Sequence, residues 1–223
     1  MGDRMAKDAL FDALALSAKA LGNGRRAELV DVLAQGERSV DELAGEIGQS
    51  VANTSQHLQQ LLRAGLVRTR RQGTRVYYSL AGAGVGQLWA VLREVAESHV
   101  AELDDLATAY LGDRSDFETI SRADLMARLL AGDVVVLDVR PTAEYRAGHI
   151  PAAVSLPIQE LPQRLRQLPV DKQVVAYCRG PYCVYADDAV RLLRRHGRQA
   201  ARLEGGFPEW VGAGLPVATE ATG

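Results

Sequence analysis

Hydrophobic residues at helical spacing open the 223-residue chain. Leu10, Leu14, Ala18 and Leu21 recur every three or four positions, which predicts an amphipathic helix that ends at Gly22-Asn23-Gly24. The same kind of periodicity continues beyond this break, so the first half of the chain is expected to be mainly helical.

Capping signals divide this helical region into short pieces. Asn23 can cap a second helix, and Ser39 with Glu42 forms a capping box that opens a third. Ser50 can cap a fourth helix, which ends at Ala64-Gly65. Two short helices around a tight glycine-containing turn are the geometry that places the second helix in a DNA major groove.

The segment after this helix alternates along residues 67–78 around Gly73, which predicts a β-hairpin. Short polar side chains on the helix suit base edges, and arginines on the hairpin suit phosphates. Helix and hairpin together predict a winged helix-turn-helix. The predicted DNA contacts are Asn53, Thr54, Ser55, Gln56 and Gln59 on the helix and Arg68, Arg70, Arg71 and Arg75 on the hairpin.

The charge distribution agrees with this interpretation. The net charge is only −2, but no acidic residue occurs between Glu46 and Glu94, a stretch that contains six arginines. An acid-free basic stretch is typical of a polyanion site, although charge alone is equally compatible with a solvated basic face. The polar helix and the basic hairpin favour DNA.

Residues 88–110 carry an apolar stripe that includes His99, with steps of three and four. We expect one long helix here that pairs with its counterpart in a homodimer, with His99 in the seam. Gly82, Gly84 and Gly86 precede it without a leading strand, so they are a hinge and not a nucleotide fingerprint. No cofactor is expected.

The second half changes pattern after the polar linker at residues 112–115. Ser121 can cap a helix, and strands are expected at residues 134–139, 173–177 and 200–203, with a helix at 184–196 between the last two. Strands separated by helices predict a parallel α/β sheet that is covered on both faces.

The chain has two cysteines, Cys178 and Cys183, so no disulfide framework holds the fold together. Cys178 follows a strand directly, and residues 178–183 lead into a helix, the position at which open α/β sheets bind ligands. Helix-start amides and Arg179 would favour a thiolate, so we expect Cys178 to have the lower pKa and to react first. The alternative is that both cysteines are buried bystanders.

Nothing in the sequence indicates a membrane partner. The longest clean aliphatic run, residues 134–137, is far too short to span a bilayer. The N-terminal segment MGDRMAKDALF has two aspartates and no apolar stretch, unlike a signal peptide. We expect a soluble, cytoplasmic protein.

Residues 39–80 resemble the core of the ArsR/SmtB family of bacterial dimeric repressors, and the resemblance extends over about residues 9–111. The specific parts are Ser55-x-His57-Leu58, the junction Ala64-Gly65-Leu66-Val67, and the Arg-Gly-Tyr wing. The resemblance implies binding of double-stranded operator DNA by a homodimer, with His57 in a packing or phosphate-contacting role.

No metal site is expected in this half. The family's arsenic and cadmium sensors place paired thiolates where this chain has Ser39-Val40-Asp41, and soft metals favour thiolates. Its zinc sensors use two paired motifs on the last helix. His99 and Glu102 match the second motif, but Gly86 and Leu88 occupy the first and cannot bind zinc.

Residues 117–217 resemble the rhodanese family at every signature: Leu137-Asp138-Val139-Arg140, Glu144-Tyr145, residues 148–153, and Glu204-Gly205-Gly206-Phe207-x-x-Trp210. Such domains carry sulfane sulfur as a persulfide on the loop cysteine, here Cys178, taken from thiosulfate or a low-molecular-weight persulfide. The implied sulfur-binding site also includes Arg179, Gly180, Pro181, Tyr182 and Cys183, together with Asp138 and Arg140 near the loop. His149 is interpreted as a turn-closing residue.

The loop departs from the family at Cys183, where an arginine is common. Thiosulfate sulfurtransfer is therefore expected to be weak, while Cys183, expected in the first turn of the following helix, could attack a Cys178 persulfide. A related phosphatase family needs one more loop residue and then arginine. Val184 follows Cys183 here, so hydrolysis of phosphate esters is not expected.

These observations predict two domains, a winged helix-turn-helix over residues 1–112 and a rhodanese-like domain over residues 117–220. The favoured function is a dimeric transcriptional repressor whose rhodanese-like domain senses or carries sulfane sulfur. Two alternatives stay open: a sulfurtransferase with a DNA-tethering domain, and an arsenite or other soft-metalloid sensor that uses both cysteines. The sequence leaves open whether the rhodanese-like domain catalyses sulfur transfer or only senses sulfane sulfur.

Overall fold

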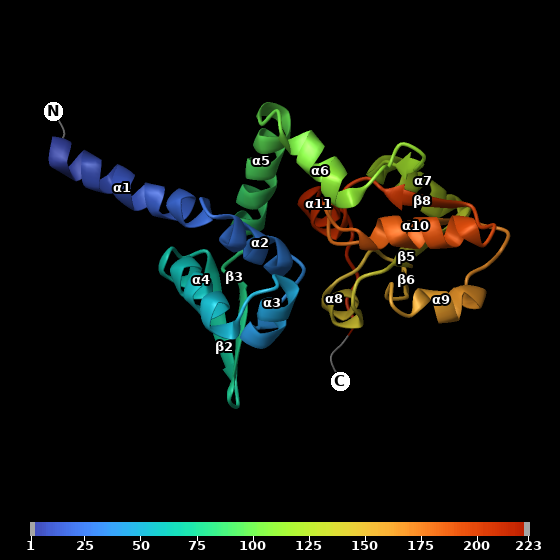
Figure 1. The fold of residues 1–223 in the computed structure, drawn as a ribbon, viewed down its shortest axis with the longest axis horizontal. Helices are drawn as coiled ribbons and strands as arrows, with labels where there is room; N and C mark the ends of the chain where they lie inside the picture. The colour runs from blue at the N-terminus through green and yellow to red at the C-terminus, as the bar shows by residue number, and fades with distance from the viewer. Residues whose placement is uncertain (1–2, 221–223) are drawn as a thin grey trace. The chain divides into compact units, whose positions relative to one another are not determined.

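Four helices at the start of the chain each begin at a side-chain cap. They are α1 (Arg4–Leu21), α2 (Gly24–Leu33), α3 (Val40–Glu46) and α4 (Val51–Arg63), capped by Asp3, Asn23, Ser39 and Ser50 (Figure 1). In each cap the side chain accepts a hydrogen bond from a backbone amide of the first turn, which satisfies one of the free donors there. The Ser39–Glu42 capping box closes in both directions. The three predicted caps are confirmed.

A three-stranded antiparallel sheet completes this unit. Its strands are β1 (Arg38–Ser39), β2 (Val67–Gln72) and β3 (Arg75–Leu80), in the order β1-β3-β2. Gly73 begins the two-residue turn of the predicted hairpin with a φ of 59°, a conformation that glycine adopts without steric cost. The core beneath is built from α2, α3, α4 and β3 and includes Leu29, Leu43, Leu58 and Tyr78.

Two helices follow, where one long helix was predicted. α5 (Ala83–His99) and α6 (Leu103–Leu111) are separated at residues 100–102. The amide of Leu103 binds the carbonyl of Val100 at 3.0 Å, three residues back, so a tighter turn interrupts the regular ladder. The prediction of a continuous helix is wrong, because apolar spacing alone does not distinguish one helix from two that meet at a turn.

The computed structural model describes residues 3–220, so residues 1 and 2 at the predicted start of the first domain lie outside it. By its contacts the chain forms two units, one ending at Glu94 and the other beginning at Val95. This boundary falls inside α5. The domain limits at residues 112 and 117 stay predictions.

The second unit is built on a five-stranded parallel sheet in the order β4-β8-β7-β5-β6. Successive residues of its central strands point to opposite faces: Val174 and Ala176 belong to one core, Val175 and Tyr177 to the other. The predicted parallel sheet with two covered faces is confirmed. The strands are β4 (Thr119–Ile120), β5 (Val134–Asp138), β6 (Val154–Ser155), β7 (Gln173–Tyr177) and β8 (Ala200–Leu203).

Helices cover both faces of this sheet. α10 (Tyr185–Arg195) and α9 (Leu161–Arg164), with a short 3-10 turn (Leu165–Gln167), pack on one face. α7 (Arg122–Ala131) and α11 (Phe207–Gly212) pack on the other, and α8 (Thr142–Ala147) follows β5. Ser121 caps α7 as predicted. The sequence did not reveal β4 and β6, which have two residues each.

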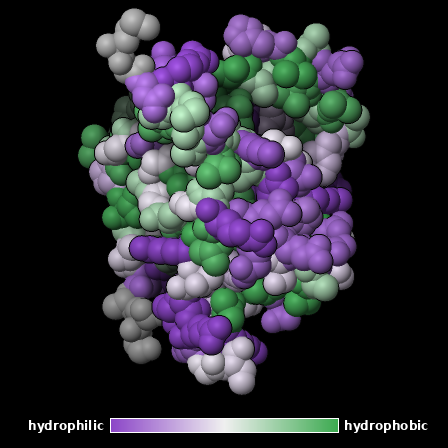
Figure 2. All heavy atoms as spheres, turned by 90° about the vertical axis from the view of Figure 1, so that its left-hand side faces the viewer, coloured by the Kyte–Doolittle hydropathy of each residue, from purple (hydrophilic) through white to green (hydrophobic). Residues whose placement is uncertain are grey.

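Apolar side chains remain exposed on α1 and α5. On α1 they include Phe11 and Leu14, and on α5 Leu88, Val91 and Val95, at 43–64% exposure. Figure 2 shows hydrophobic side chains at the surface among hydrophilic ones. Between residues 3 and 220, every helix is too short or too polar to traverse a bilayer.

Candidate functional site

The two cysteines lie in one loop at the carboxyl end of β7. Cys178 follows Tyr177 directly and is completely buried, with its Sγ 3.5 Å from the carbonyl oxygen of Cys183 and 3.8 Å from that of Gly180. The amide of Cys183 donates to Gly180 at 3.2 Å and closes the loop. α10 begins at Tyr185, so Cys183 precedes the helix. The prediction that Cys183 lies in the first turn of this helix is wrong.

The pKa values of the two thiols are displaced in opposite directions. Burial raises the pKa of Cys178, and the hydrogen bond that its thiol donates to Cys183 raises it further. That same hydrogen bond lowers the pKa of Cys183 despite its burial, and the amides of Arg179 and Tyr185 add to the effect. The expectation that Cys178 has the lower pKa is wrong, because desolvation outweighs the amides that reach its sulfur. Cys183 ionises first.

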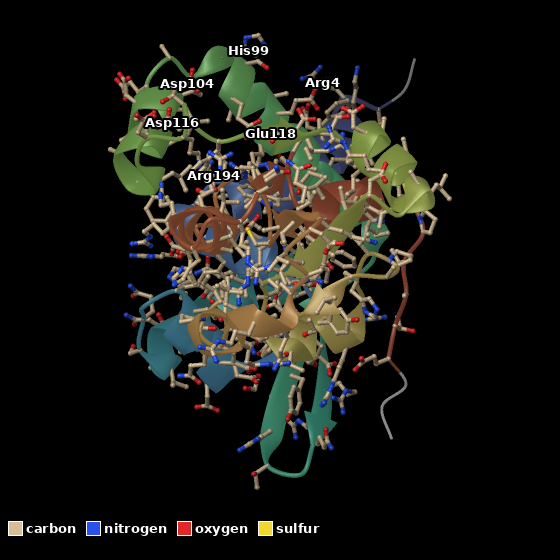
Figure 3. All side chains as sticks on the ribbon, turned by 90° about the vertical axis from the view of Figure 1, so that its right-hand side faces the viewer. Arg4, His99, Asp104, Asp116, Glu118 and Arg194 are labelled. Carbon is tan, nitrogen blue, oxygen red and sulfur yellow. The ribbon has the colours of Figure 1, made fainter. Side chains whose placement is uncertain are left out.

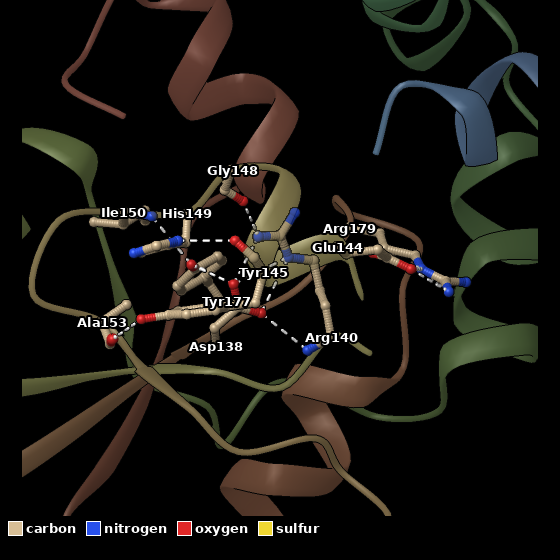
Figure 4. Close-up of polar contacts among 10 residues, drawn as sticks. All are labelled: Asp138, Arg140, Glu144, Tyr145, Gly148, His149, Ile150, Ala153, Tyr177 and Arg179. Carbon is tan, nitrogen blue, oxygen red and sulfur yellow. Dashed lines mark hydrogen bonds and ion pairs between the residues drawn. The ribbon is translucent and has the colours of Figure 1, made fainter. Parts of the chain in front are cut away.

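Arg179, predicted to stabilise a sulfur anion, is held by a carboxylate. Its guanidinium donates to Glu144 of α8 at 2.6 and 3.0 Å, and both side chains are nearly or fully buried (Figure 4). Paired forks of this kind fix orientation as well as charge. Arg179 also lowers the pKa of Cys183 through its charge. Arg179 therefore holds the loop in position through Glu144 and favours the charged form of Cys183.

Asp138 and Arg140 form a buried cluster behind the loop. Arg140 is completely buried and binds Asp138 through two nitrogens, at 2.6 and 3.0 Å, and the carbonyl of Gly148 at 2.7 Å (Figure 4). The Tyr177 hydroxyl donates to Asp138 and accepts the amide of Ile150. Because Tyr177 immediately precedes Cys178, these contacts fix the strand end from which the loop starts. Asp138 and Arg140 thus support the loop through the end of β7.

His149 is fixed by its neighbours, as its interpretation as a turn-closing residue requires. Its Nδ1 lies 2.8 Å from the carbonyl oxygen of Tyr145, and its ring stacks on the Tyr145 ring at 3.7 Å. Its backbone pairs with Ala218. The histidine thus joins the turn after α8 to the C-terminal segment.

Gly206 is required by a close approach to the cysteine loop. A Cβ at this position would lie 2.4 Å from the amide nitrogen of Gly180 and 2.6 Å from the carbonyl oxygen of Cys178. That oxygen accepts the amide of Phe207 at 2.9 Å. The Gly-Gly-Phe signature therefore places the backbone at Gly206 directly against the backbone of the cysteine loop, and the loop cannot move toward Gly206.

On the DNA-binding side, α4 exposes three of the five predicted side chains. Asn53, Gln56 and Gln59 are exposed, and Ser55 is half-buried. Thr54 is completely buried, and its hydroxyl donates to the carbonyl of Ser50 at 3.0 Å. Its assignment to a DNA contact is wrong, because it lies on the packed face of the helix.

The hairpin distributes its arginines between two faces. In an antiparallel pair, opposite residues share a face, and the register Arg68↔Ser79, Arg70↔Tyr77 and Gln72↔Arg75 places three arginines together. Arg71 lies on the other face, opposite Val76. All four arginines are exposed, and two of them have partners on the protein: Arg70 is ion-paired with Glu37, and Arg68 donates to the hydroxyl of Ser79 at 3.0 Å.

His99 lies at the end of α5 with its side chain exposed, pointing away from the ribbon in Figure 3. Within residues 3–220, histidine, cysteine, aspartate and glutamate side chains do not gather in groups of three or more that could hold a metal ion. Glu102, the other half of the partial zinc pattern, precedes α6 without capping it through its side chain.

Two family models match the chain. The model of the bacterial regulatory protein, arsR family, matches residues 23–69, and that of the rhodanese-like domain matches residues 121–213. The HTH-type transcriptional regulator Rv0324 of Mycobacterium tuberculosis is 49% identical over 95% of this chain and 92% of its own length. A sulfurtransferase of Allochromatium vinosum is 38% identical over 38% of this chain and 78% of that protein.

Among solved structures, the homodimeric winged helix-turn-helix DNA-binding domain of Mb0332 from Mycobacterium bovis is 45% identical. It covers 46% of this chain and 93% of that fragment, with a TM-score of 0.42.

A winged helix-turn-helix followed by a rhodanese-like sheet defines a two-domain transcriptional regulator. The chain belongs to the ArsR family of HTH-type transcriptional regulators and carries a rhodanese-like domain at its C-terminal side.

The close approach at Gly206 predicts a large and local effect of one methyl group. Gly206→Ala should lower the free energy of unfolding by roughly 1–3 kcal/mol, the range for overpacking, because backbone atoms cannot move aside as a flexible side chain can. Urea unfolding followed by tryptophan fluorescence measures this change. Gly212→Ala is the matched control, since a Cβ there meets nothing within 4 Å. Equal stability of the two variants would contradict the close approach.

The opposed pKa shifts predict how thiol reactivity depends on pH. In the wild type, alkylation by iodoacetamide should rise with pH through the lowered pKa of Cys183, below the value of about 8.5 for a free cysteine. Cys183→Ser leaves only Cys178, whose pKa is raised, so its alkylation should begin at higher pH. Cys178→Ala removes the thiol donor and should move the profile of Cys183 up toward the ordinary value. Identical profiles for wild type and Cys183→Ser would disprove the order of ionisation.

Proposed function

We propose that this regulator represses transcription as a homodimer and releases its operator when sulfane sulfur reaches Cys178 and Cys183. The observation that carries the proposal is the pair of cysteines in a rhodanese-like loop, where the Cys178 Sγ lies 3.5 Å from the carbonyl oxygen of Cys183 and a hydrogen bond between the two thiols shifts their pKa values in opposite directions. The DNA-binding unit contains no cysteine, so a thiol-based signal has to enter through this pair.

Dimerisation is supported by the exposed apolar side chains on α1 and α5. Leu10, Phe11 and Leu14 on one helix and Val91 and Val95 on the other are 51–64% exposed in the single chain. Several exposed apolar side chains along one helix are typical of an interaction surface. The homodimer of the Mb0332 fragment supports the same assembly. A symmetric dimer would place two α4 helices on half-sites about one DNA turn, roughly 34–36 Å, apart.

The sulfur chemistry can proceed without an added oxidant. The Cys183 thiolate attacks the outer sulfur of a persulfide RS–SH, a bond from Cys183 to that sulfur forms, and RS⁻ leaves. Cys178, once deprotonated, takes the same sulfur, and Cys183 leaves as a thiolate. Cys183 then attacks the Sγ of Cys178 and expels HS⁻. In total, one persulfide and two thiols give a disulfide, one thiol and hydrogen sulfide, with the persulfide as the oxidant.

The electrostatics favour this order of events. Cys183 is the more accessible thiol and ionises first, so it meets the donor. Cys178 is completely buried at the position that carries the persulfide in rhodanese domains. With Cys183 in place of the usual loop arginine, the loop favours intramolecular closure over repeated transfer from thiosulfate, which distinguishes sensing from sulfurtransferase turnover.

The DNA part of the proposal predicts different effects for the wing and the helix. Neutralising Arg68, Arg70 and Arg75 together should weaken binding to all DNA and lower the salt slope by about 0.9 for each phosphate that is no longer bound. Gln56→Ala should instead relax sequence preference, because this side chain reaches base edges. Fluorescence anisotropy at several salt concentrations, with operator and random DNA, measures both effects.

A matched control neutralises Arg146, Arg166 and Arg195, which are exposed in the rhodanese-like domain and change the net charge equally. This control should bind DNA with nearly the wild-type slope. If the wing variant and the control showed the same slope, the wing would not be the phosphate-binding element.

The sulfur part predicts a loss of operator affinity after treatment with a low-molecular-weight persulfide. The wild type should form the Cys178–Cys183 disulfide and bind operator about 5–150-fold more weakly, the range of ordinary allosteric coupling. Cys178→Ser should accumulate a persulfide on Cys183 without release, and Cys183→Ser should react slowly. Mass spectrometry of the protein beside operator titration gives both readouts.

Three results would redirect the proposal. Disulfide formation with unchanged operator affinity would reject sensing. Sustained turnover of thiosulfate and cyanide would favour the sulfurtransferase, with DNA binding as a tether. Tight arsenite binding by both thiols, without reaction with persulfide, would favour the metalloid sensor.

A further inference from the structure

A third buried carboxylate lies at the start of α10, next to the cysteine loop. Asp187 is completely buried and is shared by two arginines from distant parts of the second unit. Arg114 donates its Nε to one carboxylate oxygen at 2.6 Å, and Arg202 of β8 approaches the other at 3.6 Å. Asp187 is therefore expected to keep its position, because a buried charge that loses its partner is costly.

Arg114 also holds the loop itself. Its Nη1 donates to the carbonyl oxygen of Pro181 at 2.8 Å, and Pro181 lies between Cys178 and Cys183. One guanidinium therefore joins the helix that follows the loop to the backbone inside the loop. Its planar fork of donors makes this double contact possible, and a lysine ammonium would not reproduce its geometry.

The position of Arg114 in the chain gives this contact a consequence. The residue belongs to the linker between α6, which ends at Leu111, and β4, which begins at Thr119. α6 follows α5 closely, and α5 carries the exposed apolar side chains described above. Arg114 is thus the linker residue whose side chain reaches the backbone between the two cysteines.

We infer that Arg114 transmits the bonding state of Cys178 and Cys183 to the linker, an inference that rests on the proposed function. Closing the disulfide draws Cys183 toward Cys178 and displaces the carbonyl of Pro181 between them. Asp187 stays fixed in α10, so Arg114 cannot follow the loop while keeping both contacts. The linker backbone then changes position or mobility.

Arg191 provides a matched comparison on the same linker. Its Nη2 binds the carbonyl oxygens of Leu111 and Asp113 at 3.3 and 3.4 Å, but from the middle of α10 and not from the loop. Arg191→Gln therefore loosens the linker from the helix and leaves the contact with Pro181 in place. Arg114→Gln removes that contact.

The experiment uses the full chain as wild type, Arg114→Gln and Arg191→Gln, treated with a low-molecular-weight persulfide. Mass spectrometry measures disulfide formation, hydrogen–deuterium exchange measures the linker at residues 112–116, and anisotropy measures operator affinity. All three proteins should form the disulfide to the same extent. The wild type and Arg191→Gln should change linker exchange and operator affinity, while Arg114→Gln should show less than about a twofold change in affinity, below the range of ordinary coupling.

Arg114→Lys keeps the positive charge beside Asp187 and serves if the glutamine variant does not fold. This variant should also form the Cys178–Cys183 disulfide without a change in hydrogen–deuterium exchange of the linker, because lysine lacks the planar fork of donors that contacts both Asp187 and Pro181. The inference is overturned if either Arg114 variant responds as fully as the wild type, if Arg191→Gln loses the response equally, or if bridging leaves wild-type linker exchange unchanged. A wild type whose linker responds while operator affinity does not would reject the sensing function alone.

Discussion

Charges buried beneath the cysteine loop have to be matched, and this requirement organises the second unit. A carboxylate without a partner in a protein interior costs several kcal/mol, so each one fixes the position of the arginine that neutralises it. The arginines come from a strand end, from the loop itself and from the linker, and together they hold the loop at its base, at its first turn and at its exit. The three pairs are Asp138 with Arg140, Glu144 with Arg179, and Asp187 with Arg114.

The same constraint explains why the thiols differ. With the nearby arginines already committed to carboxylates, burial is the dominant influence on Cys178 and keeps its thiol protonated. The Cys178 thiol donates a hydrogen bond to Cys183, which is closer to the surface, and this bond lowers the pKa of Cys183. The buried ion pairs thus fix the residues around the loop, and the protonation and bonding of the two thiols are what can change at this site.

Local signals in the sequence predicted much of the fold. The caps at Asn23, Ser39 and Ser50, the hairpin turn at Gly73 and the strand before Cys178 all depend on neighbouring residues, and the structure confirms them. The burial of Thr54 was also present in the sequence, since Thr54, Leu58 and Leu61 share one helix face. What failed was the helix over residues 88–110, because its periodicity continues through a turn.

Features that depend on tertiary packing could not be predicted. The order of the two thiol pKa values depends on a burial that no local pattern reports. Arg114 and Asp187 are 73 residues apart, and each looks like an ordinary surface charge in its own segment. The rhodanese-like signatures located the loop, but the sequence did not show what Glu144 and Gly206 do there.

The ion pair between Arg70 on the wing and Glu37 before β1 has a consequence for the time that the protein would stay on DNA. The two groups lie 2.5 Å apart, and the guanidinium also rests over the ring of Tyr77. A DNA phosphate that binds Arg70 must first displace this carboxylate, so an encounter with random DNA exchanges one anion for another with little net gain. Glu37 would thus compete with every phosphate alike. An acidic neighbour of a basic wing would therefore weaken binding to operator and to random DNA by the same factor, which shortens residence on the many nonspecific sites of a genome without changing the ratio of the two affinities.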